Sequence, residues 1–245
     1  MSRLPAVAML SLLGVALFIS WYLPAHHGIW FTLDSHIYHA VNHQAVRHPL
    51  FADLLAITNN RVFDLCSLLA MGTLYLHYFL HADAAGRHRM LAIALAMIIT
   101  ALVLNQLGHL GHLVPVSHVS PSRYFKATPG GVSIAELTRI PTKEFSGDSF
   151  PGDHGMLLMI FAAFMLHYFG RRAFLQAVLI VLFFSTPRIL IGAHWFTDVA
   201  VGSLSIVLVG LGLWLPGGGC DALVSWLERH LPSATLFTRR HQPHG

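Results

Sequence analysis

The chain has 245 residues, of which 55% are hydrophobic and only 11% are charged. That composition excludes an ordinary soluble domain of this length and is typical of an integral membrane protein. The formal net charge of +4 suggests a polyanionic substrate, bound at the outer face of the membrane that the protein spans, rather than a nucleic acid.

Several apolar runs approach or reach the length that crosses about 30 Å of hydrocarbon. They occupy residues 5–23, 63–80, 90–107, 154–170, 173–192 and 199–215. Two of them are the weakest, because 63–80 carries Asp64 and 154–170 begins at His154. We predict an all-α fold, a six-transmembrane-helix bundle with interfacial helices, which forms a single membrane-embedded domain over residues 1–245.

Two further segments are predicted to lie on the membrane surface. Residues 24–62 are too polar to cross it, and they interleave aromatic side chains with histidines. Aromatic rings with polar tips favour the headgroup zone, so we expect interfacial helices here, begun by Asp34 or Ser35 as an N-cap. Residues 223–231 have apolar side chains at helical spacing and predict a short amphipathic helix on the cytoplasmic surface.

Short basic turns set the expected orientation of the bundle. Arg87 and Arg89 lie between the second and third runs, and Arg171 and Arg172 lie between the fourth and fifth. Because short loops rich in Lys and Arg stay in the cytoplasm, both termini are expected inside. The long loop at 108–153 is then outside, where a long ordered loop is a place to look for function.

The strongest chemical signal is the segment from Pro187 to Asp198. His194 and Asp198 are four residues apart, so they share a face if a helix begins here, and the carboxylate can then accept the Nδ1 proton. Nε2 is left free to attack as a nucleophile. Arg188 adds a permanently charged, fork-shaped group that suits the oxygens of a phosphoryl group.

A second signal runs from Asp148 to Gly155 at the outer end of the fourth run. His154 is expected to open a helix, where backbone N–H groups and the positive end of the helix dipole favour a bound phosphate. It is a candidate general acid for the leaving oxygen. A histidine with an aspartate four residues on is common by chance, but these two signals at outer helix ends together predict catalysis.

These residues resemble the type 2 phosphatidic acid phosphatase superfamily. The third motif of that family, Ser-Arg, five residues, His, three residues, Asp, is matched from Arg188 to Asp198 with Pro187 in place of the serine. The second motif, Pro-Ser-Gly-His, appears as Pro151-Gly152-Asp153-His154, so its serine is missing and Asp153 adds a negative charge. The first motif, Lys, six residues, Arg-Pro, has no match in 108–143, where possible substitutes are Arg123, Lys126, Arg139 and Lys143. Of these, Lys143, Arg123 and Lys126 are expected to bind the substrate phosphate together with Arg188.

Within the superfamily the chain resembles inner-membrane lipid A phosphotransferases over nearly its whole length, including residues 56–61, 104–108, 141–143, 148–155 and 191–198. The core motifs lie at 141–198. The resemblance implies a phosphoryl transfer from undecaprenyl diphosphate to the 1-phosphate of lipid A on the periplasmic face, through a phosphohistidine at His194. It implies lipid partners, a multi-pass inner-membrane protein and no cofactor. A plain lipid phosphatase is the alternative enzyme, and a transporter that only binds a lipid phosphate is the alternative from another class.

A group of histidines and the segment 59–61 can each be interpreted either as structural or as functional. His109, His112 and His118 suggest a metal, but a closed site needs more ligands and none is near in sequence, so we favour interfacial histidines and expect no metal. Arg61, with the asparagines Asn59 and Asn60 before it, suits headgroup anchoring and substrate binding equally well.

Overall fold

The structure is a computed structural model that describes residues 4–109, 118–126, 128 and 131–232, and these form helices joined by turns and loops. The long helices are α1 (Leu4–Tyr22), α2 (Ile29–Arg47), α4 (Arg61–His81), α5 (Ala84–His109), α8 (Asp153–Phe169) and α9 (Arg171–Leu190). The shorter elements are the 3₁₀ turn η1 (Ala25–His27), α3 (Pro49–Ile57), α6 (Pro121–Phe125), α7 (Ile134–Thr138), the π-helix η3 (Asp198–Ser203), α10 (Leu204–Trp214) and α11 (Gly219–His230).

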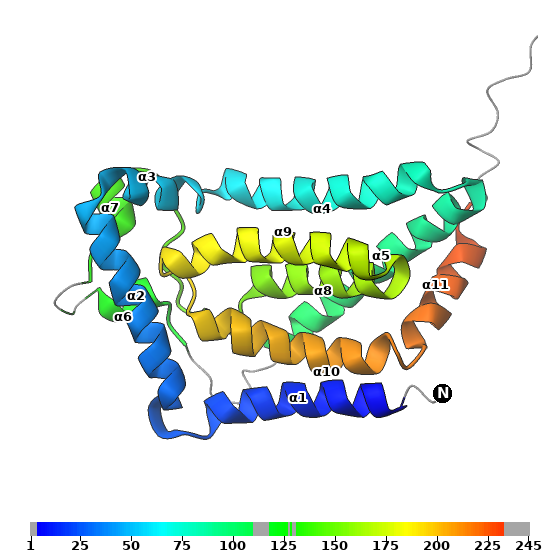
Figure 1. Ribbon diagram of the computed structural model, residues 1–245, viewed down its shortest axis with the longest axis horizontal. Coiled ribbons are helices and arrows are strands. Elements are labelled where there is room, and N and C mark those ends of the chain that lie inside the picture. The colour runs from blue at the N-terminus through cyan, green and yellow to red at the C-terminus, as the bar shows by residue number, and fades with distance from the viewer. Residues whose placement is uncertain (1–3, 110–117, 127, 129–130, 233–245) are drawn as a thin grey trace, which may run out of the picture.

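The long helices form a bundle with different structures at its two ends (Figure 1). Helices α1, α4, α8, α9 and α10 run along the long axis, and α5 crosses the bundle obliquely. Helices α2, α3, α6 and α7 gather at one end, where α2 runs across the direction of the bundle. The turns that join α4 to α5 and α8 to α9 lie at the opposite end with α11. The loops predicted outside therefore share one end, and the basic turns share the other.

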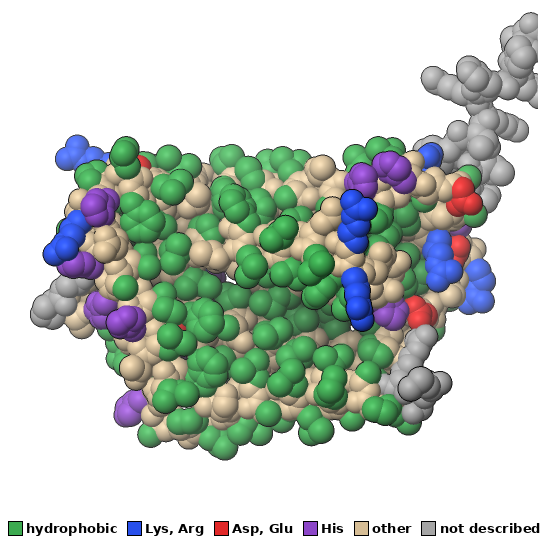
Figure 2. All heavy atoms as spheres, in the orientation of Figure 1, with side chains coloured by type: hydrophobic (Ala, Val, Ile, Leu, Met, Phe, Trp, Pro, Cys, Tyr) green, Lys and Arg blue, Asp and Glu red, His purple; other side chains and the backbone are tan. Residues whose placement is uncertain are grey.

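The described residues contain four or five candidate membrane spans, compared with the predicted six. Helices α1, α4, α5 and α9 are each long and apolar enough to cross a membrane. A fifth candidate is the stretch from η3 through α10 and α11, which is bent by 68°. Helix α8 has 17 residues and falls short of a full span by length. Figure 2 shows hydrophobic side chains over the middle of the molecule and charged side chains toward its ends, as expected of a multi-pass membrane protein.

Helix α8 forms the centre of the bundle because it packs against α5, α9 and α10. Its buried side chains, including Met156, Ile160 and Phe164, join one hydrophobic core with residues of α5 and α10. Helix α1 packs closely on α10, and a Cβ added at Gly14 would lie 2.9 Å from the backbone oxygen of Ser205. Small residues at such contacts let membrane helices approach each other closely.

The two surface segments are helical as predicted, with two differences. Helix α2 begins at Ile29 after Gly28, so neither Asp34 nor Ser35 is its N-cap. The carboxylate of Asp34 points inward and binds Thr197 instead. Helix α11 is amphipathic, but apolar side chains such as Val224 join the hydrophobic core beside α5. The apolar stripe of α11 therefore packs against α5 of the same chain.

Candidate active site

A polar cavity of about 200 Å³ lies where α4, α8 and α9 reach the end of the bundle that carries α2. Its lining includes His194, His154, Arg188, Lys143 and Asp64. Asp64 comes from the first turn of α4, His154 from the first turn of α8, and Arg188 from the last turn of α9. The cavity thus brings together residues from motifs that are far apart in the sequence.

His194 is held with its Nδ1 atom toward two acceptors. Nδ1 lies 2.9 Å from the carbonyl oxygen of Ser149 and 3.4 Å from Oδ2 of Asp198. A carbonyl oxygen can only accept a hydrogen bond, so Nδ1 carries the proton. Nε2 then keeps its lone pair, which is the state that a nucleophile requires.

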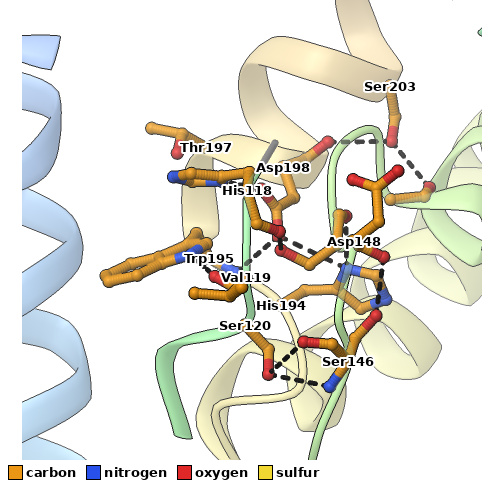
Figure 3. Close-up of polar contacts among 12 residues, drawn as sticks. His118, Val119, Ser120, Ser146, Asp148, His194, Trp195, Thr197, Asp198 and Ser203 are labelled. Atoms are coloured by element: carbon orange, nitrogen blue, oxygen red, sulfur yellow. Dashed lines mark hydrogen bonds and ion pairs between the residues drawn. The ribbon is translucent and has the colours of Figure 1, made fainter. Parts of the chain in front are cut away.

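Asp198 is completely buried, with 0% of its surface exposed, and its two oxygens have different partners. Oδ2 accepts the backbone N–H of Trp195 at 2.8 Å and faces His194. Oδ1 lies 3.0 Å from Nδ1 of His118. Figure 3 shows His118 and His194 reaching Asp198 from different sides. The buried carboxylate therefore orients two histidines.

The geometry of the pair differs from the helix-face expectation. His194 lies in the turn after α9, before the next helix begins, so His194 and Asp198 meet across a turn. Gly192 has φ +82° in this turn, a conformation that glycine adopts without strain. The carbonyl of Arg188 accepts the N–H groups of both Ala193 and His194 at 3.1 Å. The turn thereby fixes where His194 points.

A π-helix ties the two predicted motifs together. Within η3 the carbonyl of Asp198 accepts the backbone N–H of Gly152 at 3.0 Å and the Ser203 hydroxyl at 3.1 Å. The same hydroxyl also lies 2.7 Å from the carbonyl of Gly152. Single π-turns are frequent at functional sites because they free backbone groups from the regular ladder. Here those groups hold the start of α8 against the His194 turn.

Arg188 is buried and pairs with a carboxylate that the motifs did not include. Its Nη2 atom contacts Oδ1 of Asp64. The same oxygen lies 3.4 Å from Nε2 of His154. Asp64 therefore links the predicted phosphate-binding arginine to the predicted general acid.

The other three predicted phosphate-binding cations are split by the structure. Lys143 lines the cavity, whereas Arg123 and Lys126 are exposed and are not among the residues that line it. Lys126 pairs instead with Glu136 at 3.3 Å. Direct contact with a phosphate in the cavity is therefore available to Arg188 and Lys143.

Asn59 and Asn60 have a structural role that explains the position of Lys143. The side-chain amide of Asn59 donates to the carbonyl of Pro187, and the backbone carbonyl of Asn59 accepts from the hydroxyl of Thr142. Asn60 donates to the carbonyl of Pro141. These bonds fasten the loop before Lys143 to the end of α9.

Asp34 reaches the site from the surface helix α2. It accepts the backbone N–H of Thr197 at 3.1 Å and also binds the Thr197 hydroxyl. Burial raises the pKa of Asp34 to about 6. The residue beside Asp198 is thus anchored to α2.

Sequence reasoning missed the roles of Asp64, His118 and Asp34. An ionisable residue inside an apolar run, such as Asp64, is a signal of function by default. His118 was considered as a metal ligand with His109 and His112, whose side chains lie outside the described residues. In the described part of the chain no three His, Cys, Asp or Glu side chains are grouped to hold a metal.

Comparison with known proteins identifies the family of this chain. Residues 90–216 match the PAP2 superfamily. The chain is 47% identical over 230 residues to the lipid A 1-diphosphate synthase of Escherichia coli strain K12, which covers 94% of this chain and 95% of that protein. No solved structure matches it significantly.

Proposed function

This chain belongs to the PAP2 superfamily, and we propose that it transfers a phosphoryl group from undecaprenyl diphosphate to the 1-phosphate of lipid A. The name of its Escherichia coli relative, lipid A 1-diphosphate synthase, supports lipid A as the acceptor. The observation that carries the proposal is the orientation of His194, whose protonated Nδ1 faces Ser149 and Asp198 in a cavity that also holds Arg188 and Lys143.

In the first step Nε2 of His194 attacks the terminal phosphorus of the diphosphate. An N–P bond forms, the bridging P–O bond breaks, and undecaprenyl phosphate leaves. Arg188 and Lys143 neutralise the nonbridging oxygens, where charge is spread in the transition state. Asp198 and the Ser149 carbonyl hold the Nδ1 proton as the ring becomes more positive.

In the second step an oxygen of the lipid A 1-phosphate attacks the phosphorus. The N–P bond breaks, a new P–O bond forms, and His194 regains its lone pair. The acceptor oxygen is already anionic and needs no base, whereas attacking water must lose a proton. His154 acts as a general acid toward poorer leaving groups and matters less for a phosphate leaving group.

The proposed location is the inner membrane with the active site toward the periplasm. The site lies at the end of the bundle away from Arg87 and Arg171, which lie in the first helical turns of α5 and α9. Those turns favour the cytoplasm. The opposite end, with the cavity and α2, then faces the periplasm, where a lipid acceptor can reach it along the outer leaflet.

The test is to supply purified protein with lipid A and undecaprenyl diphosphate labelled at its terminal phosphate, and to separate the products by thin-layer chromatography. Label in lipid A supports transfer. Label released only as free phosphate identifies a lipid phosphatase. Label that stays in the donor, with the lipid merely bound, indicates a binding protein or transporter and contradicts both enzymatic functions.

A further inference from the structure

One oxygen of Asp64 contacts both of the groups that a phosphoryl substrate requires. Oδ1 pairs with Nη2 of Arg188 and lies 3.4 Å from Nε2 of His154. These partners belong to two other helices, so the contacts join α4, α8 and α9 at the cavity. Asp64 lies outside both of the family motifs that this chain matches, at 151–154 and 187–198.

The accessibility of the partners indicates which of them can move. The side chain of Arg188 is 9% exposed, and that of Asp64 is 33% exposed. A guanidinium buried to this degree needs an anionic partner in the empty site. A carboxylate supplies one, and its exposed side leaves Asp64 room to turn away from Arg188 when another anion enters the cavity.

If the proposed function holds, the substrate needs these same contacts. A nonbridging phosphoryl oxygen needs Arg188, and a leaving oxygen poorer than a phosphate also needs the proton of His154. The Asp64 oxygen takes both groups in the free protein. A phosphate that binds must therefore displace a carboxylate already bound there, or accept its repulsion at close range.

We propose that Asp64 is an internal anion that competes with phosphate for Arg188 and His154. The inference rests on the proposed function for the identity of the substrate, but not for the competition itself. In the empty site Asp64 keeps the buried arginine paired. In the loaded site its return to Arg188 opposes tight binding of phosphate groups, which includes the phosphorylated products, and so favours their release.

The competition makes a prediction about a simple ligand. Asp64→Asn keeps the size of the side chain and removes its charge, so inorganic phosphate should bind the purified variant about tenfold more tightly or better, measured by isothermal titration calorimetry. Asp64→Glu retains the charge and should bind phosphate as the natural protein does. Asp64→Ser removes the charge in a smaller side chain and should also tighten binding, which covers the case in which Asp64→Asn does not fold.

Two controls separate competition for Arg188 from the general charge of the cavity. Asp148 lines the same cavity. Among the described residues, the carboxylate that pairs with Arg188 and His154 is that of Asp64 and not that of Asp148. Asp148→Asn should therefore change phosphate affinity by much less than Asp64→Asn. Adding Arg188→Ala to Asp64→Asn should abolish the gain, because the gain requires the freed guanidinium.

The result that would overturn the inference is weaker or unchanged phosphate binding in the folded Asp64→Asn protein, because Asp64 would then only aim Arg188. An equal gain in Asp148→Asn overturns it as well. In the transfer assay the Asp64→Asn protein should have a lower KM for the donor without a higher kcat. The calorimetry needs no turnover, so a natural protein that binds phosphate but transfers none would contradict the proposed function alone.

Discussion

Nδ1 of His118 lies 3.0 Å from Oδ1 of Asp198, on the oxygen that does not face His194. Because Asp198 is completely buried, it depends on such donors to remain charged. The His118 ring is fixed by its neighbours, with Trp195 stacked at a centroid distance of 5.3 Å. His118 therefore acts on the reaction through Asp198.

His118→Ala should lower kcat by about 10- to 100-fold, because the carboxylate loses one donor and holds His194 less firmly. His118→Asn should keep much of the activity, since its amide can donate from nearly the position of Nδ1. Turnover by the two purified variants, compared at equal folded fraction, checks the expectation. Equal losses in both would show that the ring is needed for packing and not as a donor.

His194→Ala should abolish turnover, because the proposed mechanism has no other nucleophile to accept the phosphoryl group. Asp198→Asn should leave the protein folded and lower kcat by about 10³-fold, since the amide cannot stabilise the more positive imidazole. Mass spectrometry of protein quenched after addition of donor alone should detect phosphate on His194 in the natural protein. An active His194→Ala variant would refute this assignment.

Gly192→Ala should disturb the turn that aims His194. At φ +82° an alanine is strained by about 1–2 kcal/mol. Its Cβ would also lie 2.4 Å from the Ser122 hydroxyl oxygen and 2.7 Å from a ring carbon of Tyr38. We expect a lower melting temperature together with a loss of kcat. Gly170→Ala is the matched control, with φ +87° but open space around the added Cβ, and it should affect stability alone.

The features that the sequence predicts well are those that depend on residues close together in the chain. Apolar runs predicted where the helices lie, because the length needed to cross a bilayer shows directly in the sequence. The spacing from Arg188 to Asp198 predicted that these residues meet at one site. Basic turns predicted which loops share an end of the bundle, and the arrangement of the helices confirms that grouping.

The features that sequence did not predict depend on contacts between distant segments. The ion pair of Asp64 with Arg188 joins residues 124 apart, and the Asp34–Thr197 bond joins residues 163 apart. No local pattern encodes such pairs. The condition for a shared helix face, that a helix begins at His194, is not met, because His194 lies in the turn after Gly192 and periodicity assumes a regular helix. The expected contact of Nδ1 with the Asp198 carboxylate is present at 3.4 Å.

The buried carboxylate of Asp34 predicts a pH dependence of stability. Since burial raises its pKa to about 6, the folded state favours the protonated form more than the unfolded state does. Its contribution to stability is full below about pH 4 and is lost as the pH rises through 6, with a total on the order of 3 kcal/mol. Asp34→Asn can bond to Thr197 without ionising. Between pH 5 and pH 8 the melting temperature of Asp34→Asn should rise relative to that of the natural protein. A difference in melting temperature that is the same at both pH values would contradict this.

The orientation can be tested with single-cysteine reporters because the chain has only two cysteines, Cys66 and Cys220. After both are replaced by serine, one reporter is placed at Thr128, which bonds to Phe125 of α6 at the end with the cavity. The other is placed at Ala85 in the first turn of α5, at the opposite end, and both positions are exposed. Ala85→Cys leaves Arg87 and Arg89 in place, so it does not alter the charges that set the topology. In intact cells whose outer membrane has been made permeable, a membrane-impermeant maleimide should label Thr128→Cys and leave Ala85→Cys unlabelled until the inner membrane is broken. Labelling in the reverse order would place the cavity in the cytoplasm, where a periplasmic transfer to lipid A could not occur.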